Sequence, residues 1–235
     1  MTKIKVLLQC FFVLCLVNPI FGQIKLKELS DFVEPYSNWV KAGEVQMDSL
    51  KPEILIFKPE GDCFVNGVDG SAKYLVSEKE FKDIEFHIEF MIPKGSNSGI
   101  YFQCRYEIQI FDSWGDTEIT YYDCGGIHNR WDKSRPEGAK GVDGYAPMVN
   151  ACKAPGEWQS FDIIFRAPKF NSKGEKIKNA MFEKVMLNGV LVQQNAELSA
   201  PTKGALSGIE VASAPFRLQG GHGPVAFRNI IIKNL

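Results

Sequence analysis

The alternation of apolar and polar residues between positions 84 and 92 constrains the fold more than any other feature of the chain. Apolar side chains recur there at every second position: Ile84, Phe86, Ile88, Phe90 and Ile92. A period of two is that of a β-strand with one face in the core and the other in water. The stretch is therefore the strongest strand signal in the chain.

Similar segments occupy much of the rest of the chain. Strands are predicted at 53–57, 73–77, 99–104, 106–111, 161–166, 182–187, 190–193, 209–212, 216–219 and 225–233. Asn188-Gly189, between two of them, predicts a two-residue hairpin with a primed turn. No stretch of ten or more residues has a convincing helical period. The predicted fold class is all-β, a sandwich or jelly roll.

The N-terminal residues have the pattern of a secretory signal peptide. Lys3 and Lys5 precede an apolar run over 6–17, and Asn18-Pro19 and Gly22 follow it. The run is shorter than the about 20 apolar residues of a membrane span. We therefore expect a signal peptide over 1–22 with cleavage near Gly22, a single domain over 23–235, no membrane span, and an exported protein that is periplasmic or secreted.

Charge and motifs exclude several classes of function. The formal net charge is −1, without the basic excess of a nucleic-acid-binding protein, so no nucleic-acid partner is expected. Phosphate-binding loops, serine-esterase elbows and zincin helices are missing from the sequence. The cysteines after position 22 have no zinc-ligand spacing, and their three possible disulfide pairings stay open: Cys63, Cys104, Cys124 and Cys152.

Polar residues share one face of the predicted strand over 106–111. Tyr106, Ile108 and Ile110 can face the core, which places Glu107 and Gln109 together on the opposite face. Residues two apart on a strand lie about 7 Å apart, close enough to hold one sugar ring. An ordinary solvated strand face is the alternative interpretation.

A second polar set lies near the C-terminus. Arg217 and Gln219 alternate with apolar residues, His222 follows in a glycine-rich turn, and Arg228 lies on the polar side of the last strand. His222 is the best general-base candidate among the histidines, because imidazole titrates near neutral pH.

The segment 123–157 reads as loops of a length that is usually functional. It carries His128, a candidate ligand-binding residue, and two aromatic side chains suited to stacking on sugar rings, Trp131 and Tyr145.

Six short motifs occur in chain order and together carry a resemblance to a known family. They are Trp39-Val40-x-x-Gly43-Glu44, Asn97-Ser98-Gly99-Ile100-Tyr101-Phe102, Tyr106-Glu107-Ile108-Gln109-Ile110-x-Asp112-Ser113, Pro155-Gly156-Glu157-Trp158, Leu187-Asn188-Gly189, and Leu218-Gln219 through Phe227-Arg228-Asn229-Ile230. The set resembles the 3-keto-disaccharide hydrolase domain, also described as 3-keto-glucoside lyase/hydratase. The resemblance covers nearly the whole chain after position 22 and implies a fold similar to the concanavalin-A-like sandwich of two antiparallel sheets with a concave polar groove.

The resemblance also implies a chemistry. A ketone at C3 of a sugar acidifies the proton on C2, so that one base can remove it and expel the glycosidic oxygen from C1, after which water adds back. Such a site needs a base, a stabiliser for the enolate oxygen and an acid for the leaving group. Laminarinase-like enzymes on this fold carry three alternating acids on one strand, whereas here the strand has Glu107, Gln109 and Phe111, so ordinary retaining hydrolysis is not expected.

The residues expected to act follow from these patterns and from the resemblance. Glu107 and His222 are the catalytic candidates, either one as the C2 base, although an extra glycine before His222 departs from the family pattern. The expected substrate-binding residues are Asn97, Tyr101, Gln109, His128, Trp131, Tyr145, Arg217, Gln219 and Arg228. A divalent cation is an alternative carbonyl polariser, with Glu107, Asp112 and His222 as its ligands, but the spacing does not demand a metal.

The expected partner is an oxidised oligosaccharide or glucoside, and a 3-dehydrogenase that makes the ketone is implied. The alternative functions are a non-catalytic carbohydrate-binding module or lectin, an ordinary glycoside hydrolase, and a structural surface protein.

Overall fold

A computed structural model describes residues 22–36 and 38–235 of the chain. The predicted signal peptide lies outside the described residues except for Gly22. Within the described ranges, no helix has the length and apolar character needed to cross a membrane.

The larger of the two main sheets has nine strands. Eight follow the order β15-β14-β11-β6-β17-β4-β2-β3, and β1 pairs with β17 beside this path. The strands are β1 (Gln23–Leu26), β2 (Val40–Met47), β3 (Leu55–Pro59), β4 (Cys63–Val65), β6 (Ile84–Met91), β11 (Gln159–Arg166), β14 (Ala180–Leu187), β15 (Val190–Leu198) and β17 (Ala226–Asn234).

The smaller main sheet has four strands in the order β5-β16-β7-β8. They are β5 (Leu75–Phe81), β16 (Ala214–Leu218), β7 (Asn97–Phe102) and β8 (Tyr106–Phe111). Two short ribbons, β9 (Arg130–Trp131) with β10 (Gly141–Val142) and β12 (Lys169–Phe170) with β13 (Lys176–Lys178), and a 3-10 turn η1 (Leu29–Asp31) complete the described elements.

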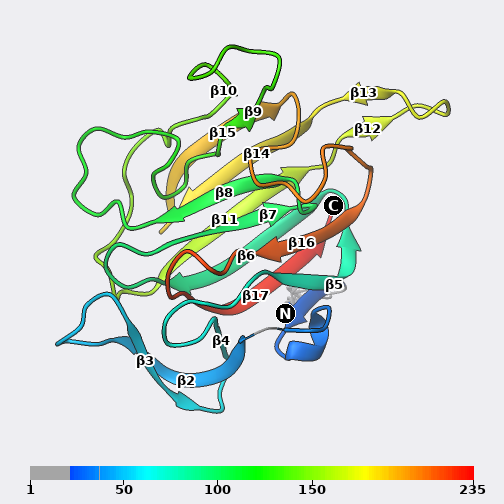
Figure 1. The fold of residues 1–235 in the computed structure, drawn as a ribbon. Coiled ribbons are helices and arrows are strands. Elements are labelled where there is room, and N and C mark those ends of the chain that lie inside the picture. Colours follow the sequence, from blue (N-terminus) through cyan, green and yellow to red (C-terminus); the bar gives the residue numbers. More distant parts are fainter. Residues whose placement is uncertain (1–21, 37) are drawn as a thin grey trace, which may run out of the picture.

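The two main sheets stack face to face as a sandwich (Figure 1). Aromatic rings from both sheets fill the space between them: Phe86 of β6 lies 5.2 Å from Phe102 of β7, and Phe165 of β11 lies 5.0 Å from the same ring. All strand pairs are antiparallel. The predicted fold class, an all-β sandwich of two antiparallel sheets, is therefore confirmed.

Most of the predicted strands are present. The strand over 84–92 is β6, and it lies between β11 and β17 inside the larger sheet. The primed turn is confirmed, because Asn188 and Gly189 both have positive φ, 53° and 79°. The strand predicted at 209–212 is wrong: the carbonyl of Ile209 accepts a hydrogen bond from Arg105 at 2.6 Å instead of joining a ladder.

Two chain segments dock along the free edge of β8. In the first, Ile127 bridges Ile108, and the amide of Gln109 donates to the carbonyl of Gly126 at 2.8 Å. In the second, the hydroxyl of Thr202 accepts from the amide of Glu107 at 3.1 Å. These segments belong to 112–158 and 199–213, and with them in place the outward-facing polar side chains of the smaller sheet are buried.

Candidate active site

Three strands of the smaller sheet place Arg217, Tyr101 and Glu107 in one row. Arg217 of β16 lies directly opposite Tyr101 of β7, and Tyr101 lies directly opposite Glu107 of β8. Neighbours in register on antiparallel strands have side chains on the same face about 5 Å apart. The row therefore brings a cation from β16 together with a phenol and a carboxyl group from the hairpin of β7 and β8.

The next row along the same face explains why a glycine occurs in the middle of β7. Gly99 lies opposite Gln109, and its carbonyl accepts from the amide of Gln219 at 2.9 Å. A Cβ on Gly99 would lie 2.3 Å from Oε1 of Glu107. The Glu107 side chain therefore leans across Gly99, between the two glutamines, and only a residue without a side chain leaves it that room.

These rows form the floor of a cavity of about 230 Å³. Its lining residues are Tyr74, Asn97, Tyr101, Glu107, Gln109, Tyr122, His128, Lys203, Gly204, Gln219 and His222. Seven of them are residues that the sequence singled out as site candidates, so the sequence patterns converge on one pocket.

Glu107 is a strongly perturbed carboxyl group in this pocket. Its side chain is buried, with 1 % of the residue surface exposed. Desolvation by burial raises its pKa from 4.5 to about 8, against the opposing effects of a hydrogen bond from Tyr101 and the charges of Arg217 and Lys203. The carboxyl group is thus a much stronger base than an exposed glutamate, and its pKa lies close to working pH.

Arg217 lies behind the pocket wall and supports it. Its guanidinium stacks 3.8 Å from the ring centroid of Tyr101 and 4.1 Å from that of Tyr74, and it donates a hydrogen bond to the carbonyl of Gly204. The residue is fully buried, and two of its nitrogens, Nε and Nη1, have no hydrogen-bond partner within the described chain. This cation holds the Tyr101 ring in place and lowers the pKa of Glu107.

Burial also raises the pKa of Tyr101, and the neighbouring Glu107 charge adds to this effect. The phenol therefore stays protonated and available as a donor to the carboxylate.

Amide groups surround the carboxyl group. The Gln109 side-chain amide donates to Oδ1 of Asn97 at 3.5 Å, and the Gln219 amide donates to the Tyr101 hydroxyl at 3.5 Å. Both bonds are at the long limit of a hydrogen bond, so a ligand oxygen with better geometry can replace either acceptor.

The two site histidines differ in their surroundings. Burial lowers the pKa of His128, whose ring packs edge-on against Tyr122 with centroids 5.1 Å apart. His222 is exposed, and its carbonyl accepts from the amide of Asn97 at 3.3 Å. His128 is thus a neutral wall of the pocket, while His222 lies at its rim.

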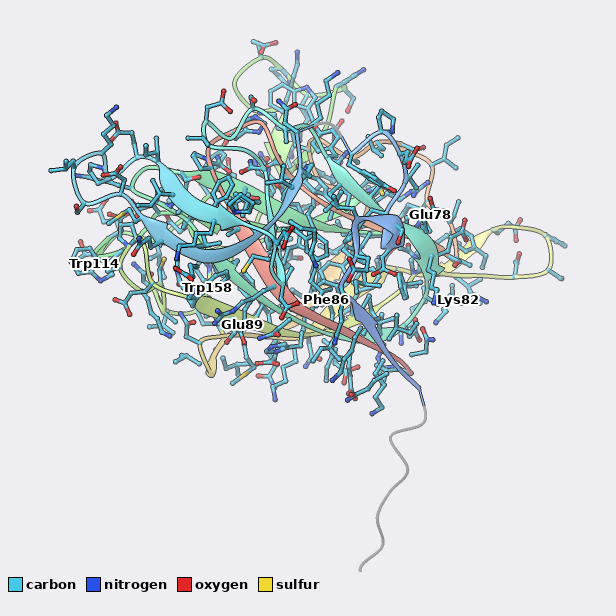
Figure 2. All side chains as sticks on the ribbon, turned by 90° about the horizontal axis from the view of Figure 1, so that it is seen from below. Glu78, Lys82, Phe86, Glu89, Trp114 and Trp158 are labelled. Carbon is cyan, nitrogen blue, oxygen red and sulfur yellow. The ribbon has the colours of Figure 1, made fainter. Side chains whose placement is uncertain are left out.

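Several predicted site residues lie elsewhere. Arg228 is on β17 of the larger sheet, where Nε donates to Glu89 at 2.6 Å and the guanidinium stacks 3.8 Å from the Trp158 ring. Its two partners, Glu89 and Trp158, are labelled in Figure 2. Tyr145 does not line the pocket, and its hydroxyl donates to the carbonyl of Glu197 at 2.8 Å. The predictions for Arg228 and Tyr145 are therefore corrected. For Arg228, an outward position on a strand does not say which sheet carries the strand, and for Tyr145, the loop pairs its backbone with Ile127 and its hydroxyl with Glu197.

Trp131 lines a separate cavity beside the pocket, and 44 % of its surface is exposed to solvent.

The three predicted metal ligands are not brought together. Asp112 accepts from the amide of Gly95 at 2.8 Å and closes the turn before β7, and it does not line the pocket with Glu107 and His222. Among the described residues, no group of three or more His, Cys, Asp or Glu side chains has an arrangement that can hold a metal ion. The pocket lining carries one carboxyl group and two imidazoles, those of Glu107, His128 and His222, and these three do not form such an arrangement.

Sequence reasoning missed four residues of the pocket: Tyr74, Tyr122, Lys203 and Gly204. Tyr74 precedes β5, and the other three lie in the segments that dock on β8. No periodic pattern marks loop residues, so only their polar and aromatic character was available as a signal.

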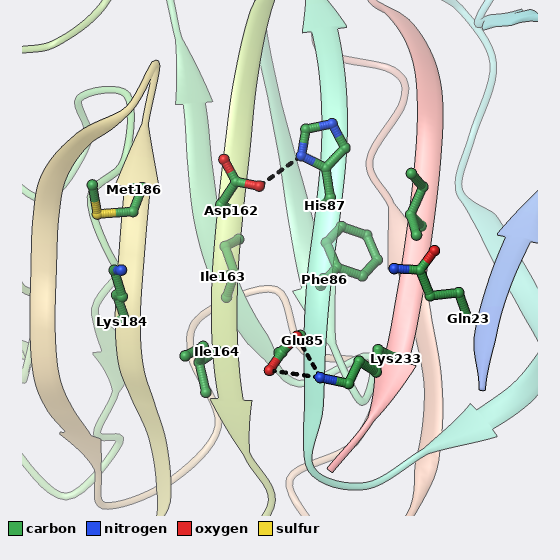
Figure 3. Close-up of a pocket in the computed structure, with 11 residues that line it drawn as sticks. Gln23, Glu85, Phe86, His87, Asp162, Ile163, Ile164, Lys184, Met186 and Lys233 are labelled. Carbon is green, nitrogen blue, oxygen red and sulfur yellow. Dashed lines mark hydrogen bonds and ion pairs between the residues drawn. The ribbon is translucent and has the colours of Figure 1, made fainter. Parts of the chain in front are cut away.

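A second hollow, of about 240 Å³, lies on the outer face of the larger sheet (Figure 3). Its charged side chains pair across the strands: Nδ1 of His87 lies 2.7 Å from Asp162, and Lys233 lies 3.2 Å from Glu85. Such cross-strand polar pairs are typical of an exposed sheet face.

The chain is thus an all-β sandwich with a polar pocket on its smaller sheet. The model of the 3-keto-alpha-glucoside-1,2-lyase-like domain family matches residues 27–233, and the chain belongs to this family. No curated protein matches the chain at a significant level.

Among solved structures, the chain is similar to three proteins of Parabacteroides distasonis that are provisionally named glycosyl hydrolases. The first has 23 % identity and a TM-score of 0.55, with 88 % of this chain and 84 % of that chain covered. The second has 22 % identity and a TM-score of 0.50, with 74 % and 87 % covered, and the third has 16 % identity and a TM-score of 0.50, with 84 % and 89 % covered. At this identity the likeness establishes the sandwich fold.

Proposed function

We propose that this protein cleaves 3-keto-glycosides by elimination followed by hydration, with net hydrolysis of the glycosidic bond. The observation that carries the proposal is a single buried carboxyl group, Glu107, whose pKa burial raises to about 8. Among the described residues that line the pocket, Glu107 is the only acid. Ordinary retaining and inverting glycosidases need two carboxyl groups, whereas abstraction of an acidified C–H proton needs one base.

In the proposed reaction the Glu107 carboxylate removes the proton on C2 of the sugar. The electrons of the C2–H bond form the enolate with the C3 ketone, and collapse of this enolate breaks the bond between C1 and the glycosidic oxygen. Water then adds to C1 of the resulting 2-hydroxy-3-keto-glucal, and C2 regains a proton. The products are the free 3-keto sugar and the leaving alcohol.

The other pocket residues have the functions that these steps require. The side-chain amides of Gln109 and Gln219 flank Glu107 and can donate to the developing oxygen on C3. Tyr101 donates to Glu107 and, with Arg217 behind it, sets the basicity of the carboxylate. His222 at the rim is assigned to protonate the leaving oxygen, which frees the alcohol toward solvent.

The proposed reaction requires another enzyme that supplies its substrate, and it has an expected cellular location. An oxidoreductase must make the ketone at C3 before this protein can act, and we propose such a 3-dehydrogenase as its functional partner. The signal-peptide pattern supports action outside the cytoplasm.

Turnover of a 3-keto-glucoside and of its unoxidised parent glucoside by the wild type and by Glu107→Gln, His222→Ala and Glu78→Gln proteins tests the proposal. We expect the wild type to cleave only the keto form, with a loss of about 10²–10⁴-fold in Glu107→Gln. Glu78 is exposed on β5 and outside the pocket, so Glu78→Gln is the matched control. Full activity of Glu107→Gln refutes the assignment, hydrolysis of the unoxidised glucoside favours an ordinary hydrolase, and sugar binding without turnover favours a lectin.

A further inference from the structure

A second cavity of about 580 Å³ adjoins the pocket of Glu107. The two share a wall, because Lys203 and Gly204 line both. The pocket of about 230 Å³ is smaller than the roughly 300–1,000 Å³ of a typical drug-sized ligand site, so it has room for about one sugar ring. The remainder of a glycoside must lie outside it, and the adjoining cavity is next to it.

This cavity is built from two chain segments that are tied together. Arg130 donates to Asp143 at 2.5 Å, and Asp143 accepts from the hydroxyl of Ser199 at 2.8 Å. The amide of Lys203 also donates to the carbonyl of Asn129 at 2.7 Å. The β9–β10 hairpin is therefore fixed against the segment 199–205, so the cavity is preformed.

The walls of the cavity are positively charged. Its described lining residues include three cations and no acid: Arg130, Lys133 and Lys203. Asp143 and Asp132 neutralise Arg130, at 2.5 Å and 3.5 Å. Lys203 lies over the Trp131 ring, with Nζ 5.3 Å from its centroid, and Lys133 is exposed on the hairpin. The aromatic plane and two ammonium groups thus face one space.

We propose that this cavity is the subsite for the leaving portion of the substrate and that it favours a leaving sugar that carries a carboxylate, a uronic acid, over a neutral sugar. Trp131 supplies the stacking surface, Lys203 and Lys133 supply the charge, and Arg130 holds the hairpin in place. The assignment of the cavity to the leaving sugar rests on the proposed function. Binding of the free sugar to the cavity does not depend on turnover and can be measured by itself.

Equilibrium binding of free glucuronate and of free glucose, measured by calorimetry or ligand-observed NMR, tests the subsite. Glucuronate is expected to bind several-fold more tightly than glucose to the wild type. Lys133→Gln is expected to weaken glucuronate binding about 2–5-fold, as for an exposed ion pair, and to leave glucose binding unchanged. High salt should give the same loss in the wild type. Lys173→Gln, in the exposed turn between β12 and β13, is the matched control.

Trp131→Ala is expected to weaken the binding of both sugars. Equal affinity for the two sugars, or an unchanged affinity for glucuronate in Lys133→Gln, overturns the inference.

Kinetics then separate the two proposals. With 3-keto-glucosides that carry either glucose or glucuronate as leaving sugar, Lys133→Gln should raise KM about 2–5-fold for the glucuronate substrate only, with kcat unchanged. If the wild type cleaves neither substrate but still prefers glucuronate in binding, the proposed reaction fails and the anionic subsite stands. If both substrates are cleaved with equal KM, the reaction stands and the subsite inference fails.

Discussion

Replacement of Glu107 by glutamine is expected to abolish activity and, at alkaline pH, to stabilise the fold. Burial raises the pKa of this carboxyl group from 4.5 to about 8. Between these values the folded protein binds a proton that the unfolded chain has released, so the free energy of unfolding falls as pH rises through this window. Each pKa unit corresponds to about 1.4 kcal/mol, which gives an upper limit of about 5 kcal/mol lost by pH 9.

Glutamine has the same shape and stays neutral, so it avoids this loss. For a domain of this size about 1 kcal/mol shifts Tm by roughly 2–4 °C. We expect the Tm of Glu107→Gln to exceed that of the wild type by roughly 5–15 °C at pH 9 and to match it near pH 5, where the carboxyl group is protonated in the folded state.

Thermal unfolding by circular dichroism from pH 5 to pH 9 measures this difference, with Glu78→Gln as the exposed control that should follow the wild type. A Tm difference between Glu107→Gln and the wild type that is independent of pH would refute the reasoning, because it would mean that Glu107 is already ionised in the folded protein at low pH.

Four further predictions concern the same side chains and two cysteines. The kcat/KM for a 3-keto-glucoside should rise toward alkaline pH and level off above about 8, because Glu107 must be ionised to accept the C2 proton; a flat profile between pH 7 and pH 9 contradicts this. Gly99→Ala should lower kcat roughly 10²-fold, since its Cβ would lie 2.3 Å from Oε1 of Glu107 and displace the carboxyl group; unchanged kcat contradicts the packing argument. Arg217→Met should move the midpoint of the pH profile upward, because the Arg217 charge lowers the Glu107 pKa, and an unmoved midpoint argues against that coupling. A mild thiol oxidant should join Cys124 to Cys152, whose thiols contact each other, and raise the free energy of unfolding by roughly 3 kcal/mol; peptide mapping that finds another pair contradicts the contact.

The alternation in the sequence was sufficient to predict most of the strands of the two main sheets and which side chains share a face. Glu107 and Gln109 do lie together, opposite the core-facing Ile108. The same pattern misses strand β2, because Glu44 has a φ of 47° and the pairing with β3 shifts between Gly43 and Gln46, which interrupts the alternation.

The burial of the polar face was not predictable from the strand itself. An outward-facing glutamate on an isolated strand is solvated, and Glu107 is buried only because distant segments, around 125–128 and 199–206, dock on β8. Contacts between residues that lie this far apart in the sequence depend on tertiary packing, and they leave no periodic pattern in the local sequence. For the same reason Arg228, which lies on the polar side of its strand, was predicted to bind substrate although that strand belongs to the larger sheet.

The most direct test of the proposed chemistry is the fate of the hydrogen on C2. The wild-type protein is incubated with a 3-keto-glucoside in D2O. The released sugar is analysed by NMR and mass spectrometry before the C2 hydrogen of the 3-keto compounds exchanges spontaneously with the solvent. Elimination and hydration predict deuterium at C2 of the released 3-keto sugar, with no release by Glu107→Gln. Release of a sugar that retains its C2 proton would contradict elimination and would indicate direct hydrolysis at C1.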